Sequence, residues 1–147
     1  MKSIKLFLAV VVASAFTMTS CSNDDDAGIS TDGNITGIWN YARTVTNLNG
    51  QETSTDHEHE AGCDKDYQEF VASGVFRDVV LYKNASNVCT EDAQTATWSK
   101  SGNTLTLTGS EAGTYEIIRL DGSELHYKTT STTGGVTLIV TRVFTRN

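Results

Sequence analysis

The residues best suited to chemistry lie in one short stretch, DHEHEAGCDKD, at positions 56–66. Its first nine positions hold two histidines, His57 and His59, together with four acidic residues and Cys63. Imidazole, thiolate and carboxylate groups are the side chains that bind Zn²⁺ and Cu²⁺ in proteins. Histidines two positions apart in an extended strand point to the same face, so both could reach one ion. Whether the stretch is a metal site depends on the state of Cys63.

The first twenty residues, 1–20, predict a lipoprotein signal peptide. Lys2 and Lys5 flank the start of a mostly apolar run over residues 6–16. This run is shorter than the roughly 20 residues of a membrane-spanning helix and fits the core of a secretory signal. It leads into MTSC, which resembles the lipobox of bacterial lipoproteins, where the cysteine sulfur carries a diacylglycerol. Those proteins usually have leucine in place of Met18, and an ordinary cleaved signal is the alternative to lipidation at Cys21.

Residues 21–35 predict a flexible, lipidated tether, because they are polar, contain glycine and lack an apolar period. Several acyl chains hold a protein on a membrane stably, whereas one chain gives only marginal binding. We therefore expect an outer-membrane lipoprotein of the cell envelope. The acidic run at residues 24–26 is either a solvated spacer or, by resemblance, the segment that follows the lipid cysteine in some surface-exposed lipoproteins.

The two remaining cysteines, Cys63 and Cys89, are expected to form a disulfide, as an even pair in an exported chain generally does. The bridge would stabilise the fold by roughly 3 kcal/mol in the chain-entropy model, and it removes Cys63 as a metal ligand. The opening stretch is then interpreted as a solvated rim loop. A weak zinc or copper site at His57 and His59 with a neighbouring carboxylate is the alternative, so no metal or cofactor is predicted.

Residues 36–147 are the predicted folded domain, with a length typical of one domain. The sequence contains no proline, and 20 of its 22 threonines follow Cys21; β-branched side chains favour strands. No segment has a helical apolar period of useful length, whereas alternating apolar residues and turn signals predict eight or nine sequential strands. The expected turns lie at residues 47–50, 73–74, 101–103, 121–122 and 134–135.

This pattern predicts an all-β fold, an antiparallel up-and-down meander of eight to nine strands. A meander of this length removes its exposed edges by closing into a barrel. Eight strands enclose an interior that either is filled by side chains or holds one small ligand. A β-sandwich is the alternative.

Composition and motifs argue against several classes of function. Loss of Lys2 and Lys5 with the signal changes the formal charge from −7 to −9, and phosphate contacts need clustered lysine and arginine. The sequence has no Gly-x-Ser-x-Gly elbow, no phosphate-binding glycine loop and no His-Glu-x-x-His motif. His126 stands alone on a predicted strand. We therefore expect neither an enzyme nor a nucleic-acid-binding protein.

Four stretches, covering nearly the whole domain, resemble a known family: GIWNYART, KDYQEFVASGVFRDV, ATWSKSGNTLTLT and YEIIRLDGSELHYK. Gly37 and Trp39 open the first strand as the Gly-x-Trp motif does in lipocalins, and the wider chain is similar to the bacterial lipocalin-like domain of small lipoproteins. In lipocalins an arginine near the last strand packs across this tryptophan at the closed end of the barrel. The resemblance implies Arg142 in that role; an exposed strand arginine is the alternative.

The resemblance also implies a function, the binding of a small, partly apolar ligand inside the barrel. Strand alternation places Arg43 inside as the inward cation, facing Asp78, water or the head group of a ligand. The alternative is a structural or protein-interaction module of the envelope with a filled barrel, whose protein partner the sequence does not identify. The candidate pocket residues are Tyr41, Arg43, Phe70, Phe76, Asp78, Trp98, Leu107, Tyr127 and Phe144.

Overall fold

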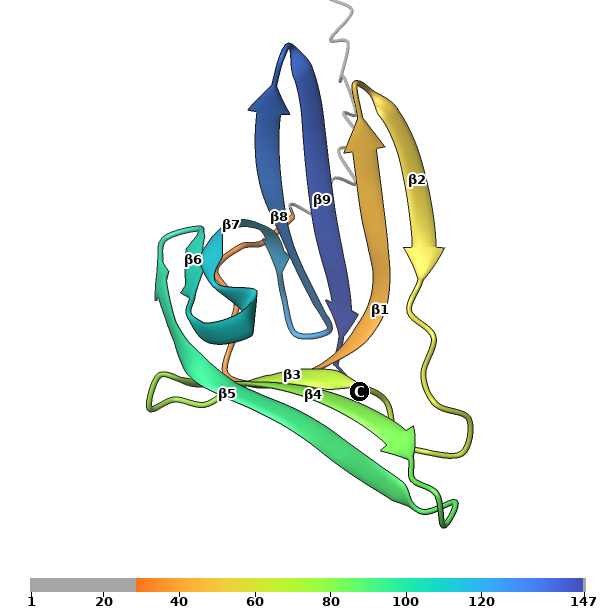
Figure 1. Ribbon diagram of the computed structural model, residues 1–147. Coiled ribbons are helices and arrows are strands. Elements are labelled where there is room, and N and C mark those ends of the chain that lie inside the picture. The colour runs from red at the N-terminus through yellow and green to blue at the C-terminus, as the bar shows by residue number, and fades with distance from the viewer. Residues whose placement is uncertain (1–28, 147) are drawn as a thin grey trace, which may run out of the picture.

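The computed structural model describes residues 29–146 (Figure 1), so the predicted signal peptide, Cys21 and the acidic run at residues 24–26 lie outside the described residues. No helix among residues 29–146 has the length and apolar character needed to cross a membrane. The elements are β1 (Gly37–Leu48), β2 (Gln51–Asp56), β3 (Tyr67–Phe70), β4 (Val75–Lys83), β5 (Cys89–Ser101), β6 (Thr104–Leu107), the 3₁₀ turn η1 (Gly109–Glu111), β7 (Gly113–Leu120), β8 (Glu124–Thr133) and β9 (Val136–Thr145).

The strands form one antiparallel sheet in the order β2-β1-β3-β4-β5-β6-β7-β8-β9, and pairing of β1 with β9 closes it. Eight strands make the barrel, while β2 is an extra strand that pairs with the second half of β1. In Figure 1 the hairpins β1–β2 and β8–β9 stand side by side and project beyond β6 and β7. The predicted all-β, up-and-down barrel is confirmed, and the sandwich alternative is not.

Each predicted turn coincides with a connection between consecutive strands. The β8–β9 hairpin is the clearest case, because Gly134 and Gly135 have φ values of 60° and 81°. Two consecutive left-handed residues match the twist of a tight hairpin, and glycine adopts this conformation without steric cost. The turn signals therefore set the strand order.

The closed end of the barrel is filled by a single apolar cluster. Alternate residues of the strands point inward, and their side chains are almost completely shielded from solvent. Each such side chain contributes roughly 1.5–3 kcal/mol relative to an exposed one. The cluster consists of Ile35, Trp39, Phe70, Phe76, Leu105, Leu107, Ile117, Leu120, Leu125, Tyr127 and Phe144.

The arginine that packs across Trp39 is Arg146, not the predicted Arg142. The Arg146 guanidinium carbon lies 3.8 Å from the centroid of the indole ring, and its Nη2 donates a hydrogen bond to the Thr36 carbonyl at 2.8 Å. Tyr41 pairs with Phe144 across β1 and β9, so the residue two positions beyond Phe144 reaches the level of Trp39. The expected stacking is present, with a different arginine.

A bulge in β1 reverses the expected alternation. The pairing with β9 shifts between Tyr41 and Arg43, which leaves Ala42 as the extra residue. Beyond a bulge, side chains point to the opposite faces from those that the period predicts. Arg43 is consequently exposed and is not the inward cation, while Thr44 pairs with Arg142 and shares its face.

Part of the predicted tether lies against the barrel. The Gly33 N–H donates to the Leu120 carbonyl at 3.2 Å, and the Leu120 N–H donates to the Ser30 carbonyl at 2.6 Å. A Cβ atom at Gly33 would lie 2.6 Å from the Leu120 oxygen, so only glycine allows this approach. Ile35 is buried in the core. The packed structure therefore begins before residue 36.

Candidate functional site

Five of the nine predicted pocket residues belong to the filled base of the barrel. Phe70 and Phe76 lie with their ring centroids 5.2 Å apart, and Tyr127 stacks on Phe144 at 5.3 Å. Leu107 is also in this cluster, and the partly buried Trp98 packs against it. The lower part of the predicted pocket is thus occupied by its own side chains.

Above this base, a chain of hydrogen bonds crosses the barrel interior. The Tyr127 hydroxyl donates to Gln68 Oε1 at 2.8 Å, Gln68 Nε2 donates to the Tyr41 hydroxyl at 2.8 Å, and Tyr41 donates to Asp78 Oδ1 at 2.6 Å. Burial raises the pKa of both tyrosines. Burial also raises the pKa of the Asp78 carboxyl, against the opposing effect of the Tyr41 hydrogen bond. Hydrogen bonds that connect side chains in this way tie four strands to one another.

The inward cation at this level is Arg142. Its Nη1 lies 2.5 Å from Glu111 Oε2, and the two side chains are 32% and 22% exposed. Glu111 is the last residue of the 3₁₀ turn η1. Its backbone carbonyl accepts a hydrogen bond from the Tyr115 hydroxyl at 2.9 Å. The predicted pair of Arg43 with Asp78 is therefore replaced by Arg142 with Glu111, while Asp78 accepts from Tyr41. We call Tyr41, Asp78, Glu111 and Arg142 the polar level.

The strand faces above the polar level carry exposed apolar side chains. Val80 and Tyr82 follow Asp78 in alternation on β4 and are 47% and 43% exposed. On the opposite side, Val136 points to the same face of β9 as Arg142, because the two are an even number of residues apart. Leu48 of β1 pairs with Leu138, which is also on this face of β9. Val136 is 44% exposed and Leu48 is 49% exposed. These are two exposed apolar pairs on separate strands, because the end of β4 and the tips of the β1–β2 and β8–β9 hairpins lie apart in Figure 1. We call these four residues the inner wall.

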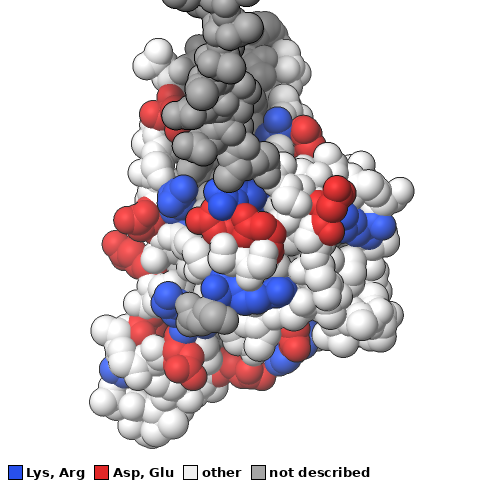
Figure 2. Space-filling model, turned by 180° about the vertical axis from the view of Figure 1, so that it is seen from behind, with Lys and Arg blue, Asp and Glu red and all other residues white. Residues whose placement is uncertain are grey.

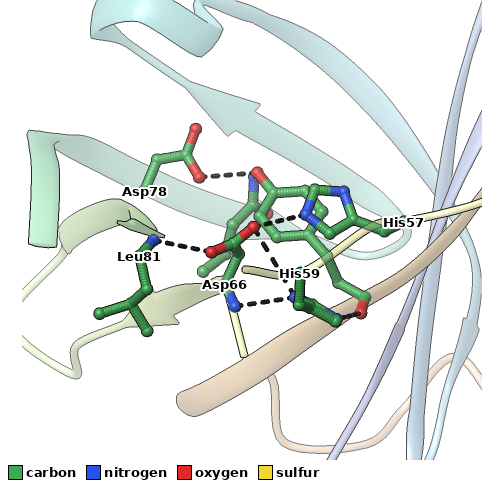
Figure 3. Close-up of polar contacts among 7 residues, drawn as sticks. His57, His59, Asp66, Asp78 and Leu81 are labelled. Carbon is green, nitrogen blue, oxygen red and sulfur yellow. Dashed lines mark hydrogen bonds and ion pairs between the residues drawn. The ribbon is translucent and has the colours of Figure 1, made fainter. Parts of the chain in front are cut away.

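The loop of residues 57–66 connects β2 to β3 beside the β1 bulge (Figure 3). His57 Nε2 lies 2.7 Å from Asp66 Oδ2, and the Leu81 N–H donates to Asp66 Oδ1 at 2.7 Å. The Asp66 N–H donates to His59 Nδ1 at 3.0 Å, and His59 Nε2 lies 3.0 Å from the Tyr41 carbonyl oxygen. The rings of the two histidines lie with their centroids 4.8 Å apart, although both residues are in a loop and not in the extended strand for which this approach was considered.

The acid beside the two histidines is Asp66, and not one of the carboxylates adjacent to them in sequence, Asp56 or Glu58, that were the predicted candidates. Asp66 is 3% exposed. The ring of His57 stacks on that of Tyr41, with centroids 4.7 Å apart. The loop is therefore packed against the barrel rather than only solvated.

The predicted disulfide is confirmed. Cys63 and Cys89 are bonded, with Cα atoms 5.7 Å apart and a sequence separation of 26. The bond ties the loop of residues 57–66 to the first residue of β5. As expected, Cys63 is not available as a metal ligand.

A groove of about 600 Å³ lies outside the barrel, between residues 63–65 and the strands β1, β3, β4 and β5. Ile38 lines it and alternates with Trp39, so the groove is on the face of β1 opposite the core. None of the nine predicted pocket residues lines this groove.

Charged side chains are interspersed on the face shown in Figure 2, where acidic and basic groups alternate over the described residues. Several charged side chains of the described residues are paired: Arg77 lies 3.0 Å from Glu69, and Arg119 lies 2.7 Å from Asp121 and 2.8 Å from Glu124. Exposed pairs of this kind contribute little to stability. This face offers no extended charged patch that would attract a polyelectrolyte.

Comparison with known proteins gives a matching family and similar solved structures. The model of the lipocalin-like domain family matches residues 35–127. A solved structure of a bovine odorant binding protein, a deswapped triple mutant, is similar at 15% sequence identity and a TM-score of 0.40, covering 76% of this chain and 72% of that chain. No match was found among curated proteins. Since the family model spans more than half of the sequence, this protein belongs to the lipocalin-like domain family.

Proposed function

We propose that this protein is a lipid-anchored protein of the cell envelope that binds a small, partly apolar molecule against the inner wall of its barrel. The observation that carries this proposal is the exposure of the inner-wall side chains on strand faces beyond the polar level. Valine, leucine and tyrosine side chains are costly to leave in water, and covering them contributes about 25 cal/mol per Å². The filled base indicates that the ligand binds near the mouth, above Tyr41 and Arg142.

The polar level suits the polar end of such a ligand. Arg142 and Glu111 remain about one-third and one-fifth exposed, so a ligand can reach them without unfolding the core. A few placed polar groups beside a largely apolar surface are typical of small-molecule sites and fix the orientation of the ligand. The proposed activity is binding, with no covalent chemistry.

Substitution in the inner wall should weaken binding of an apolar fluorescent probe. Val80→Ser removes one contact, and burial of a valine corresponds to roughly 1.5 kcal/mol, which is about a tenfold change in Kd. Ile38→Ser is the matched control, because Ile38 is 46% exposed against 47% for Val80 but lies on the outer face. Fluorescence titration with a fatty-acid or aromatic probe measures both variants.

The expected result is saturable binding that weakens in Val80→Ser and is unchanged in Ile38→Ser. Equal weakening in both variants would place the probe elsewhere. Failure of every apolar probe to bind would favour the second candidate function, a structural or protein-interaction module. The filled base of the barrel is the observation that favours this second candidate.

The lipid anchor gives a separate prediction, because acylation at Cys21 is the proposed cause of membrane association. The Cys21→Ala protein should move from the membrane fraction to the soluble fraction when cells are lysed and fractionated at high salt. High salt removes proteins held only by surface charge. Continued sedimentation of Cys21→Ala with membranes under these conditions would contradict the anchor.

A further inference from the structure

We infer that His57, His59 and Asp66 form a binding site for a divalent transition-metal ion with the preferences of zinc. Each residue offers one ligand atom, and these three atoms lie within 4.8 Å of one another. Two imidazoles and a carboxylate are a common ligand set for such ions. The proposed small-molecule site does not use these residues, so the inference stands independently of it.

The buried carboxylate of Asp66 favours a cation at this position. Its side chain is 5% exposed, and within residues 29–146 its ion-pair partners are His57 and His59, with no lysine or arginine among them. A buried carboxylate is costly unless it is paired or coordinates a metal. An imidazole supplies positive charge only when it is protonated. A divalent cation between the three side chains would supply the missing charge.

The ring of His59 is held with Nδ1 facing Asp66. A carbonyl oxygen only accepts hydrogen bonds, so the contact of His59 Nε2 with the Tyr41 carbonyl at 3.0 Å requires the hydrogen on Nε2. The lone pair of this histidine is then on Nδ1, which faces Asp66 (Figure 3). Metal-binding histidines commonly donate their other ring N–H to a carbonyl or carboxylate in this way. His59 is therefore oriented with Nδ1 toward Asp66, and zinc would replace the hydrogen bond that this nitrogen accepts from the Asp66 N–H at 3.0 Å.

The distances between the three ligand atoms are close to those of a zinc site. Bonds of about 2.0–2.2 Å to zinc place the ligand atoms of a tetrahedral site roughly 3.4 Å apart. Asp66 Oδ2 lies 2.7 Å from His57 Nε2 and 3.7 Å from His59 Nδ1, so these separations bracket the required value. His57 is 32% exposed on its side chain, which leaves its ring room to adjust and leaves the fourth position open to water.

The same ligand set disfavours calcium and magnesium, which prefer six or more oxygen ligands or retain several waters. The site would join three parts of the fold: the loop of residues 57–66, the β1 bulge contacted by His59, and β4, whose Leu81 N–H donates to Asp66. Metal binding should therefore raise thermal stability, since a ligand that binds only the folded state stabilises it by mass action.

Isothermal titration of Zn²⁺ into the purified protein tests the inference. The protein must carry no affinity tag, and reductant must be omitted so that the Cys63–Cys89 disulfide supplies no thiolate. We expect one zinc per chain, a higher melting temperature with zinc, and neither response to Ca²⁺ or Mg²⁺. His57→Gln and Asp66→Asn should each weaken zinc binding by at least about tenfold, the lower limit for loss of even an outer-shell partner.

His126→Gln is the matched control, since His126 is the remaining histidine of the chain and lies near Glu124 instead. Because Asp66→Asn could perturb the loop, His57→Gln carries the decision; circular dichroism confirms that each variant is folded. The inference is overturned if zinc does not bind, if Ca²⁺ binds as tightly, or if His57→Gln binds zinc as tightly as His126→Gln does.

Discussion

Replacing Trp39 with alanine is expected to lower the free energy of unfolding by about 3–5 kcal/mol, the range for large-to-small changes of buried aromatic residues. The Trp39 side chain is completely buried, and its Nε1 donates a hydrogen bond to the Ile35 carbonyl at 2.7 Å. Alanine would leave a cavity at the closed end and an unpaired carbonyl. Unfolding in guanidinium or urea, monitored by circular dichroism, measures the loss.

Arg146→Ala should cost less, because a cation stacked on an indole contributes about 0.5–2 kcal/mol depending on burial. Since the two side chains are in contact, the double variant should be less destabilised than the sum of the single variants. Arg142→Ala is the comparison, because Arg142 pairs with Glu111 instead and its effect should add to that of Trp39→Ala. The opposite result would contradict the contact of Arg146 with Trp39. In that case the effect of Arg146→Ala would add to that of Trp39→Ala, the effect of Arg142→Ala would not, and Arg142 would be the arginine that packs on Trp39.

Reduction of the Cys63–Cys89 disulfide is expected to lower the free energy of unfolding by about 2–4 kcal/mol. The bond closes a segment with a sequence separation of 26, which restricts the unfolded chain more than the folded one. Denaturant titrations with and without reductant should therefore differ in midpoint. In the untreated native protein, both cysteines should resist alkylation.

A double variant, Cys63→Ser with Cys89→Ser, separates loss of the bond from other effects of the reductant. It should match the reduced wild-type protein and show no further change when reductant is added. Identical midpoints for oxidised and reduced protein would contradict the prediction, as would rapid alkylation of the native protein without reductant.

Strand order and core composition were predictable from the sequence because their signals are local. Turn residues such as Gly134 and Gly135 require a particular backbone conformation wherever they occur. Alternation placed Phe70 and Phe76 on one face, and the structure confirms this contact. The same alternation could have identified Gln68, a buried polar residue two positions before Phe70.

The errors arose where long-range pairing decides the outcome. Ala42 carries no backbone signal for a bulge, yet the bulge turned Arg43 outward. Arg142 and Arg146 share one face of β9, and only the register against β1 determines which arginine reaches Trp39. Asp66 could not be selected by spacing, because the segment before β3 is irregular and sequence distance there does not set spatial distance.

The pairing of β1 with β9 also determines when the barrel can form. Asn40, at the start of the fold, pairs with Thr145, near the end of the chain, so closure joins residues that are far apart in sequence. Such non-local pairing pays a large loop-closure entropy before it gains contacts, and folds dominated by it form in milliseconds to seconds rather than microseconds. Until β9 has been synthesised, one edge of β8 and one edge of β1 remain unpaired, which makes the incomplete chain prone to association. The barrel therefore cannot close before the ten residues of β9 are available to pair with β1 and β8.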